Sequence, residues 1–119
     1  MEIGTVQTQF GQIHAEVGRY PKGGAIYVQF YTHAEGYPEP FLTLSTNILP
    51  VGGGLGSDEL CVKTWSENEP FIEDIFNSGW FEDTGRKVAS GFVRAPIWRL
   101  KDSKHVPETS TQLKRHQAA

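Results

Sequence analysis

The first half of the chain alternates apolar and polar residues with a period of two. In two segments, residues 12–20 and 25–33, the apolar members are Ile13, Ala15, Val17, Ile26, Val28 and Phe30. Because successive side chains of a strand point to opposite faces of a sheet, this pattern predicts two strands that each bury one face. Proline and glycine in residues 21–24 favour a tight turn, so the two strands are expected to pair as a hairpin.

The same period predicts further strands at residues 5–10, 41–48, 59–65 and 92–100. Short connections between the first four strands favour an antiparallel meander. Pro96 has no backbone N–H, which argues for an edge position or a bulge in the last strand. Residues 83–86, Asp-Thr-Gly-Arg, indicate a turn.

One helix is predicted over about residues 67–78. Its apolar stripe consists of Phe71, Ile72, Ile75 and Phe76. Ser66 with Glu69 fits a capping box, and Asn68 is a rival N-cap. Gly79 supplies the left-handed conformation that ends a helix. We therefore expect an α+β domain over residues 1–101, in which the helix covers one face of an antiparallel sheet of five to six strands.

The charge of the chain is polarised, although its net charge is only −3. Residues 58–83 contain eight acidic residues and one base, Lys63, whereas residues 84–119 contain eight bases and two acids. The pI of about 5.8 argues against nucleic acid as the main partner, since dedicated binders are usually strongly basic. Residues 102–119 are polar and basic and contain no aromatic side chain, which predicts a disordered tail.

No motif in the chain identifies a reaction, and we expect no enzyme activity, no cofactor and no metal. The four histidines, His14, His33, His105 and His116, are not spaced as i+2 to i+4 pairs with another ligand. The single cysteine, Cys61, lies in a predicted strand and favours a small buried side chain over a reactive thiol. Residues 50–57 are rich in glycine but lack the Gly-Lys-Ser/Thr of a phosphate loop, which indicates a mobile connection.

Two observations favour a cytoplasmic protein with no membrane association. No apolar run approaches the ~20 residues that span a bilayer. The first residues, Met-Glu-Ile-Gly, lack the pattern of a signal peptide. A single cysteine also fits a reducing compartment.

Two groups of residues are candidate partner-binding sites. The acidic candidates are Glu67, Glu69, Glu73, Asp74, Glu82 and Asp83. They form either a solvated surface or one that imitates nucleic-acid phosphates and binds a basic groove on a partner. Tyr27 and Tyr31 share the strand face opposite Ile26, Val28 and Phe30, where they make either a partner-binding patch or a second, minor core.

Three stretches, Leu60–Glu69, Ser78–Arg86 and Gly91–Val93, resemble a family of short proteins with no assigned function that are carried on proteobacterial plasmids, phages and integrative elements. The resemblance implies an inhibitor of host defence, such as an anti-CRISPR that blocks a Cas protein or another nucleic-acid-binding protein of the bacterial host. Direct binding of nucleic acid is not expected. Because the total charge is low, any imitation of nucleic acid should be local.

Two other functions remain open. One is a nucleic-acid-associated accessory protein of a mobile element, whose candidate contacts are Arg94, Arg99, Lys101, Lys104, Lys114 and Arg115. The other is a small ligand-binding domain, which requires a concave pocket with convergent polar groups.

Overall fold

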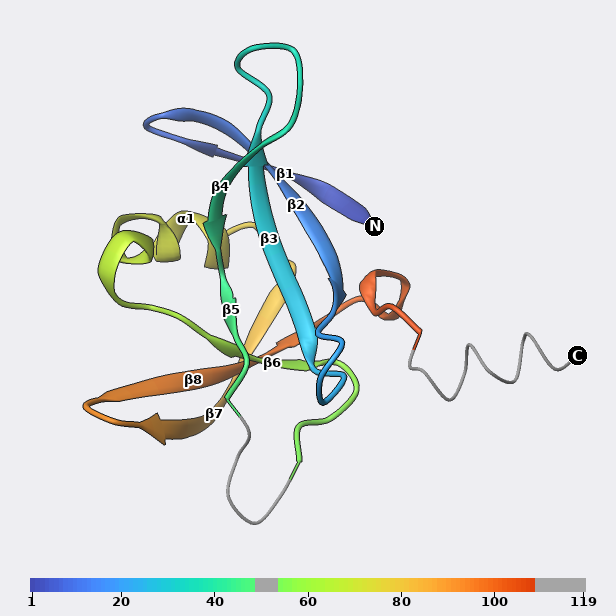
Figure 1. Ribbon diagram of the computed structural model, residues 1–119, viewed down its shortest axis with the longest axis vertical. Coiled ribbons are helices and arrows are strands. Elements are labelled where there is room, and N and C mark those ends of the chain that lie inside the picture. The colour runs from blue at the N-terminus through green and yellow to red at the C-terminus, as the bar shows by residue number, and fades with distance from the viewer. Residues whose placement is uncertain (49–53, 109–119) are drawn as a thin grey trace, which may run out of the picture.

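The computed structural model describes residues 1–48 and 54–108. Within these residues the chain forms two four-stranded antiparallel sheets, one short helical segment between β6 and β7, and a 3-10 turn after β8 (Figure 1). The α+β class with antiparallel pairing is therefore confirmed, but the single sheet of five to six strands is wrong. The helices of the described residues are too short to span a membrane.

The first sheet follows the predicted meander. Its strands, in spatial order, are β1 (Glu2–Thr8), β2 (Gly11–Arg19), β3 (Ile26–Thr32) and β4 (Glu39–Thr43). In β2 and β3 the residues predicted to face the core, such as Ile13, Val17 and Phe30, are almost completely buried. The alternating pattern therefore identified the inner face of this sheet correctly.

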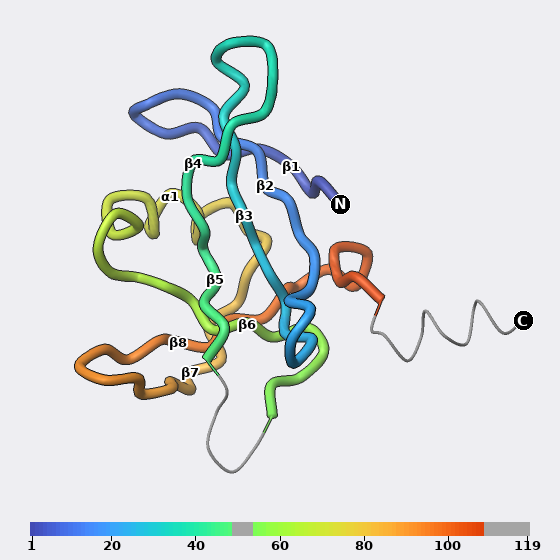
Figure 2. The backbone as a smooth tube through the Cα atoms, in the orientation of Figure 1, coloured from blue at the N-terminus to red at the C-terminus, as the bar shows by residue number. Residues whose placement is uncertain are grey.

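The second sheet begins where the predicted strand 41–48 divides. Its spatial order is β5 (Ser45–Thr46), β6 (Glu59–Val62), β8 (Val93–Leu100) and β7 (Phe81–Ser90). Leu44 and Ser45 still bond the backbone of Val28, through the Leu44 N–H and the Ser45 Oγ. β5 then pairs with β6 instead of β3, so one continuous stretch of chain joins the two sheets (Figure 2).

Strand β7 includes the residues predicted to form a turn. Gly85 N donates to Asp83 Oδ1 at 2.8 Å, Thr84 Oγ1 donates to the Ile97 carbonyl at 2.8 Å, and the register shifts between Asp83 and Lys87. The turn signal thus marks a bulge, after which the strand resumes. Pro96 lies in β8 between two strands, but the pairing with β6 covers only Ile97 to Arg99. The missing N–H therefore lies beyond the last paired residues of β6 and β8 and beside the bulge in β7.

The helical segment consists of a 3-10 helix, η1 (Ser66–Phe71), followed by α1 (Ile72–Phe76). The predicted capping box is wrong, because Trp65 is the N-cap, no side chain caps the first turn, and Ser66 has a φ of 55°. Pro70 lies inside η1, and its ring would clash with the carbonyl four residues earlier in an α-helix, which is consistent with the 3-10 geometry of this turn. Gly79 has a φ of 87°, which agrees with its predicted place after the helix.

Both sheets and the helical segment share one core. Phe30, Leu44, Leu60, Ile75 and Trp98 belong to the same buried cluster. Phe71 and Ile75 are buried against the inner face of the first sheet, whereas Phe76 is 37% exposed, more than its place in the apolar stripe predicts. The helical segment therefore covers inner faces and leaves the outer face of the first sheet open.

Arg19 orders the beginning of the predicted tail. Its guanidinium donates to the carbonyls of Gly24, Ser57, Pro107 and Glu108 at 2.7–3.2 Å. Burial lowers the pKa of this guanidinium. Residues 103–105 form a 3-10 helix, η2 (Ser103–His105), so residues 102–108 differ from the expected disorder. The remainder of the predicted tail, and residues 50–53 of the glycine-rich connection, lie outside the described residues.

Candidate functional site

A cavity of about 460 Å³ lies between the helical segment and the second sheet. We call it the acidic groove, and its lining residues are Thr64, Glu69, Ile72, Glu73, Phe76, Asp83 and Trp98. Three of the six predicted acidic candidates, Glu69, Glu73 and Asp83, therefore line one concavity. The first two come from the helical segment and the third from β7.

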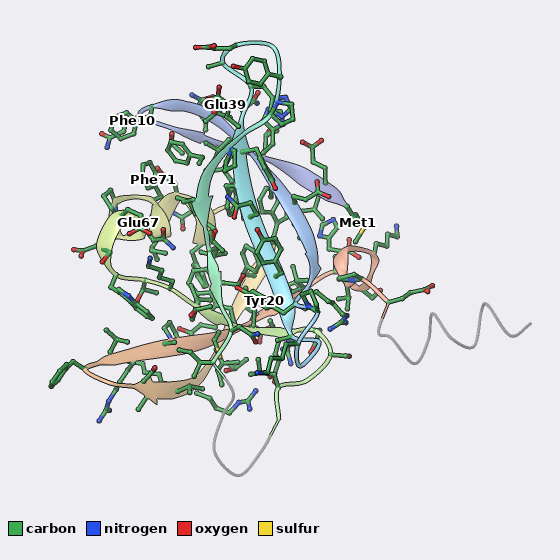
Figure 3. The ribbon with its side chains drawn as sticks, viewed as in Figure 1. Met1, Phe10, Tyr20, Glu39, Glu67 and Phe71 are labelled. Carbon is green, nitrogen blue, oxygen red and sulfur yellow. The ribbon has the colours of Figure 1, made fainter. Side chains whose placement is uncertain are left out.

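Asn68 holds the helical side of the groove in place. Its side chain is completely buried, and Nδ2 donates to the carbonyls of Thr43 at 2.7 Å and Lys63 at 2.9 Å. These two bonds join η1 to the end of β4 and to the chain that follows β6. Phe71 packs on Phe41 with ring centroids 5.0 Å apart and also contacts Phe10, which lies beside it in Figure 3. With this side buried, the carboxylates of Glu69 and Glu73 are left on the exposed side.

The floor of the groove is apolar. Phe76 and Trp98 meet edge to face with ring centroids 5.0 Å apart, and Ile72 is half-buried beside them. An apolar floor under carboxylates suits a lysine or arginine side chain, whose aliphatic stem packs on apolar surface while its charged head reaches the acids. The groove can thus bind a basic side chain from another molecule.

The other acidic candidates differ in their electrostatic surroundings. The Lys63 ammonium bonds Glu67 at 2.6 Å and lowers its pKa, and Arg99 bonds Glu82 at 2.8 Å, which raises the pKa of Arg99. Asp74 is exposed and does not line the groove. Within residues 1–48 and 54–108, no ion pair forms at Glu69, Glu73 or Asp83. Of the four acidic candidates without an ion pair in the described residues, three therefore line the groove, and Asp74 lies outside it.

Tyr27 and Tyr31 lie on a different surface from the acidic groove. They alternate with the buried residues of β3 and thus occupy the outer face of the first sheet. Tyr27 donates to Gln29 Oε1 at 2.9 Å and packs edge to face on Tyr20, and its pKa is raised chiefly by burial. The structure therefore does not join the two tyrosines to the acids as one patch.

A second polar cluster lies on that outer face. Glu2, His14 and His33 come together there, and we call them the histidine cluster. The spacing rule along the chain missed it because the three residues are far apart in sequence. The register of the strands could have revealed the cluster. His14 pairs with Tyr31, and His33 lies two residues after Tyr31, directly after the end of β3, so its side chain falls on the same face as that of Tyr31 and can reach His14.

The basic residues proposed to contact nucleic acid differ in their surroundings. Arg99 is paired with Glu82, and Lys101 lies at the edge of cavities on either side of β8's end. Arg94 and Lys104 are exposed, and Lys114 and Arg115 lie outside the described residues. Cys61 is buried in β6, where burial raises the pKa of its thiol, in keeping with a packing role.

Searches of protein-family models, curated proteins and solved structures found no match for this chain.

Proposed function

We propose that this protein is a mobile-element inhibitor of host defence that acts by protein–protein binding, as an anti-CRISPR that blocks a Cas protein. The observation that supports the proposal is the acidic groove, in which three carboxylates that form no ion pair with any described residue surround an apolar floor. A basic segment of a partner can both pair with these carboxylates and cover the apolar floor, whereas water can only solvate the carboxylates.

A nucleic-acid-binding protein presents such segments. Its lysine and arginine side chains are placed to contact phosphates, and carboxylates held on a folded surface can take the place of those phosphates. Uncompensated charge also speeds the encounter with a basic partner. The proposal therefore assigns the groove the task of occupying part of the partner's nucleic-acid site.

The imitation of nucleic acid is local in this proposal. Glu67 and Glu82 are neutralised by Lys63 and Arg99, and the whole chain carries a net charge of only −3. The apolar floor, with Phe76 37% exposed, supplies the buried area that charge alone does not provide.

The test compares two triple variants that remove the same amount of charge. E69Q/E73Q/D83N neutralises the groove, and Asn at position 83 keeps an acceptor for Gly85 N. E67Q/D74N/E82Q neutralises three acids that do not line the groove. Both are assayed for protection of a phage in a host with active CRISPR interference and for binding to the purified Cas protein.

The groove variant should lose at least about tenfold in binding, equivalent to 1.4 kcal/mol, while the matched control stays near wild type. Equal losses in both variants would show that charge acts without regard to the groove. Full activity of the groove variant would remove the groove from the mechanism. Absence of protection by the wild-type protein against every CRISPR type tested would overturn the anti-CRISPR proposal itself.

A further inference from the structure

The histidine cluster is assembled from three neighbouring segments of the first sheet. Glu2 is the first residue of β1, His14 lies in the middle of β2, and His33 directly follows β3. One side-chain ligand atom from each of the three lies within 4.8 Å of the other two. His14 is half-buried and the other two are exposed, so the cluster is open to solvent on one side.

A bulge in β1 brings Glu2 onto this face. Gly4 pairs with Ala15, and regular pairing would then place Glu2 opposite Val17, whose side chain is buried in the core. The register instead shifts between Glu2 and Gly4, so that Glu2 pairs with Glu16 on the outer face. Bulges of this kind re-aim side chains and are frequent at functional sites.

The two imidazoles are stacked face to face, so their in-plane lone pairs run parallel, and rotation of one ring has to bring those lone pairs to a common point. Their ring centroids are 3.9 Å apart with an interplanar angle of 9°, and His14 Nδ1 lies 2.8 Å from Glu2 Oε1. Two ligand atoms on one tetrahedral ion are about 3.3 Å apart, given metal–ligand distances of about 2.0–2.1 Å. The separation of 2.8 Å is shorter than that value, the others are no longer than 4.8 Å, and the exposed side chains of Glu2 and His33 leave room for the rotation that binding requires.

We propose that Glu2, His14 and His33 bind one divalent first-row transition ion, with Zn²⁺ as the ion of reference. Two imidazoles and one carboxylate suit Zn²⁺ and its neighbours in the series, whereas Mg²⁺ and Ca²⁺ prefer oxygen ligands throughout. The site is on the opposite face of the first sheet from the helical segment, so this inference does not depend on the function proposed for the acidic groove.

The cluster opens onto a cavity that leaves space for a fourth ligand. A cavity of about 420 Å³ is lined by the cluster together with Glu16, Tyr31 and Pro38. Glu16 is on the same face as His14, and its carboxylate bonds the Met1 ammonium. A three-ligand site with space beside it is the arrangement of zinc centres that keep one position for water or an external ligand.

The experiment uses tag-free protein, because a polyhistidine tag binds the same ions. Zn²⁺ binding is measured by isothermal titration and by native mass spectrometry, and Co²⁺ provides a visible absorption spectrum that reports coordination. We expect one ion per chain, and a rise in melting temperature of roughly 5–10 °C at a metal concentration about 100-fold above the dissociation constant. Mg²⁺ should give no such rise.

Three variants test the ligands. H14N and H33Q keep a polar side chain of similar reach but lose the imidazole, and E2Q removes the carboxylate charge. Each should weaken Zn²⁺ binding by more than about 100-fold, since even changes to groups behind the ligands cost 10–100-fold. H105A, which removes a histidine outside the cluster, is the matched control and should bind as the wild type does.

The apo forms of all four variants are compared by thermal melting, so that loss of metal binding is separated from loss of fold. Wild-type affinity in the double variant H14N/H33Q would overturn the proposal, as would a wild-type protein that takes up no Zn²⁺ at 100-µM scale concentrations. An equal response to Mg²⁺ would also overturn it, because that result would indicate binding by surface carboxylates alone.

Discussion

The acidic groove and the histidine cluster both present carboxylates, but those of the cluster have charged or hydrogen-bonding partners and those of the groove have no ion pair among the described residues. In the groove, Glu69, Glu73 and Asp83 have no ion pair within residues 1–48 and 54–108. In the cluster, Glu2 bonds His14 and the neighbouring Glu16 bonds the Met1 ammonium. In Figure 3 the label of Met1 lies across the molecule from that of Glu67. Uncompensated charge over an apolar floor suits a basic partner, whereas convergent polar groups suit a small ion.

The supports of the two regions also differ. The groove depends on one buried side-chain amide, that of Asn68, which bonds η1 to the backbone carbonyls of Thr43 and Lys63. The cluster depends on a backbone irregularity at Gly4 that turns Glu2 outward. Changing either support should therefore damage one region and leave the other in place.

The largest effect is expected at Asn68. In Asn68→Asp, a carboxylate would face the Thr43 and Lys63 carbonyls with no donor, inside a fully buried site. We expect a loss of about 3–5 kcal/mol in the free energy of unfolding, which urea denaturation at pH 7 measures. Asn77→Asp makes the same change at the exposed end of α1 and should cost less than about 1 kcal/mol. Equal costs would show that the buried bonds do not hold the groove.

Gly4→Ala breaks the other support. Gly4 has a φ of 153°, and an added Cβ would lie 2.6 Å from Cζ2 of Trp80. We expect a loss of about 2–3 kcal/mol and weaker Zn²⁺ binding, because relief of the clash moves the bulge that positions Glu2. Gly18→Ala in β2 is the matched control, since nothing lies within 4 Å of its Cβ. A Gly4→Ala protein with wild-type stability and wild-type Zn²⁺ affinity would contradict this role of the bulge.

Glu59 in the second sheet is paired with Arg86, so, unlike the acids of the groove, it should make the free energy of unfolding depend on pH. Burial alone would raise the pKa of Glu59, but its hydrogen bonds from Arg86 and the Gly56 N–H, and the charges of Arg86 and Arg99, lower it below the usual value of 4.5. Glu59 therefore stabilises the fold above the unfolded-state pKa, and that contribution is lost as pH falls through the lower folded-state pKa.

The corresponding variant is Glu59→Gln. It should lower the free energy of unfolding at pH 7 by up to about 1 kcal/mol, and the difference from the wild type should shrink as the pH falls below about 4.5. Urea denaturation at several pH values between 7 and 3 measures it. A difference that stays constant over this range would show that the charge of Glu59 is not its source.

The smallest effect on stability is expected from the groove variant E69Q/E73Q/D83N. Its three carboxylates are exposed and form no ion pair within the described residues, so their neutralisation should change the free energy of unfolding by no more than about 0.5 kcal/mol. Relief of mutual repulsion should make any gain larger at low salt. Denaturation at two ionic strengths measures this, and a large loss would mean that the acids support the fold as well as a partner.

Local patterns predicted strands for all of the first sheet, with β1 shifted from residues 5–10 to Glu2–Thr8, and also β6 and β8 of the second sheet, but they missed β7. Residues 12–20 and 25–33 alternate cleanly because one face is buried and the other open, and both strands occur where expected. Strand β7 was missed because its Asp83–Arg86 bulge has the composition of a turn. The capping box failed because the first turn is a 3-10 helix in which Ser66 is the first residue and Trp65 is the N-cap, and no side chain caps it.

The candidate site also combines features that the sequence predicted with features that it missed. Sequence identified all three acids of the groove, but their separation from Glu67 and Glu82 depends on where Lys63 and Arg99 lie. It also placed Tyr27 and Tyr31 on the correct strand face, but it did not show that the helical segment covers the other side of that sheet. The histidine cluster was missed altogether, because its ligands meet only through strand pairing.

By itself, the sequence determined which faces of its strands are buried, the apolar anchors Phe71 and Ile75, and the glycine that follows the helix. These features depend on residues close together in the chain, where periodicity and backbone preference act directly. Only the tertiary structure decided that strand 41–48 divides between two sheets, that Glu67 and Glu82 form ion pairs, and that Glu2 reaches His14 and His33. Those outcomes depend on pairing between distant segments, whose order and register no local pattern specifies.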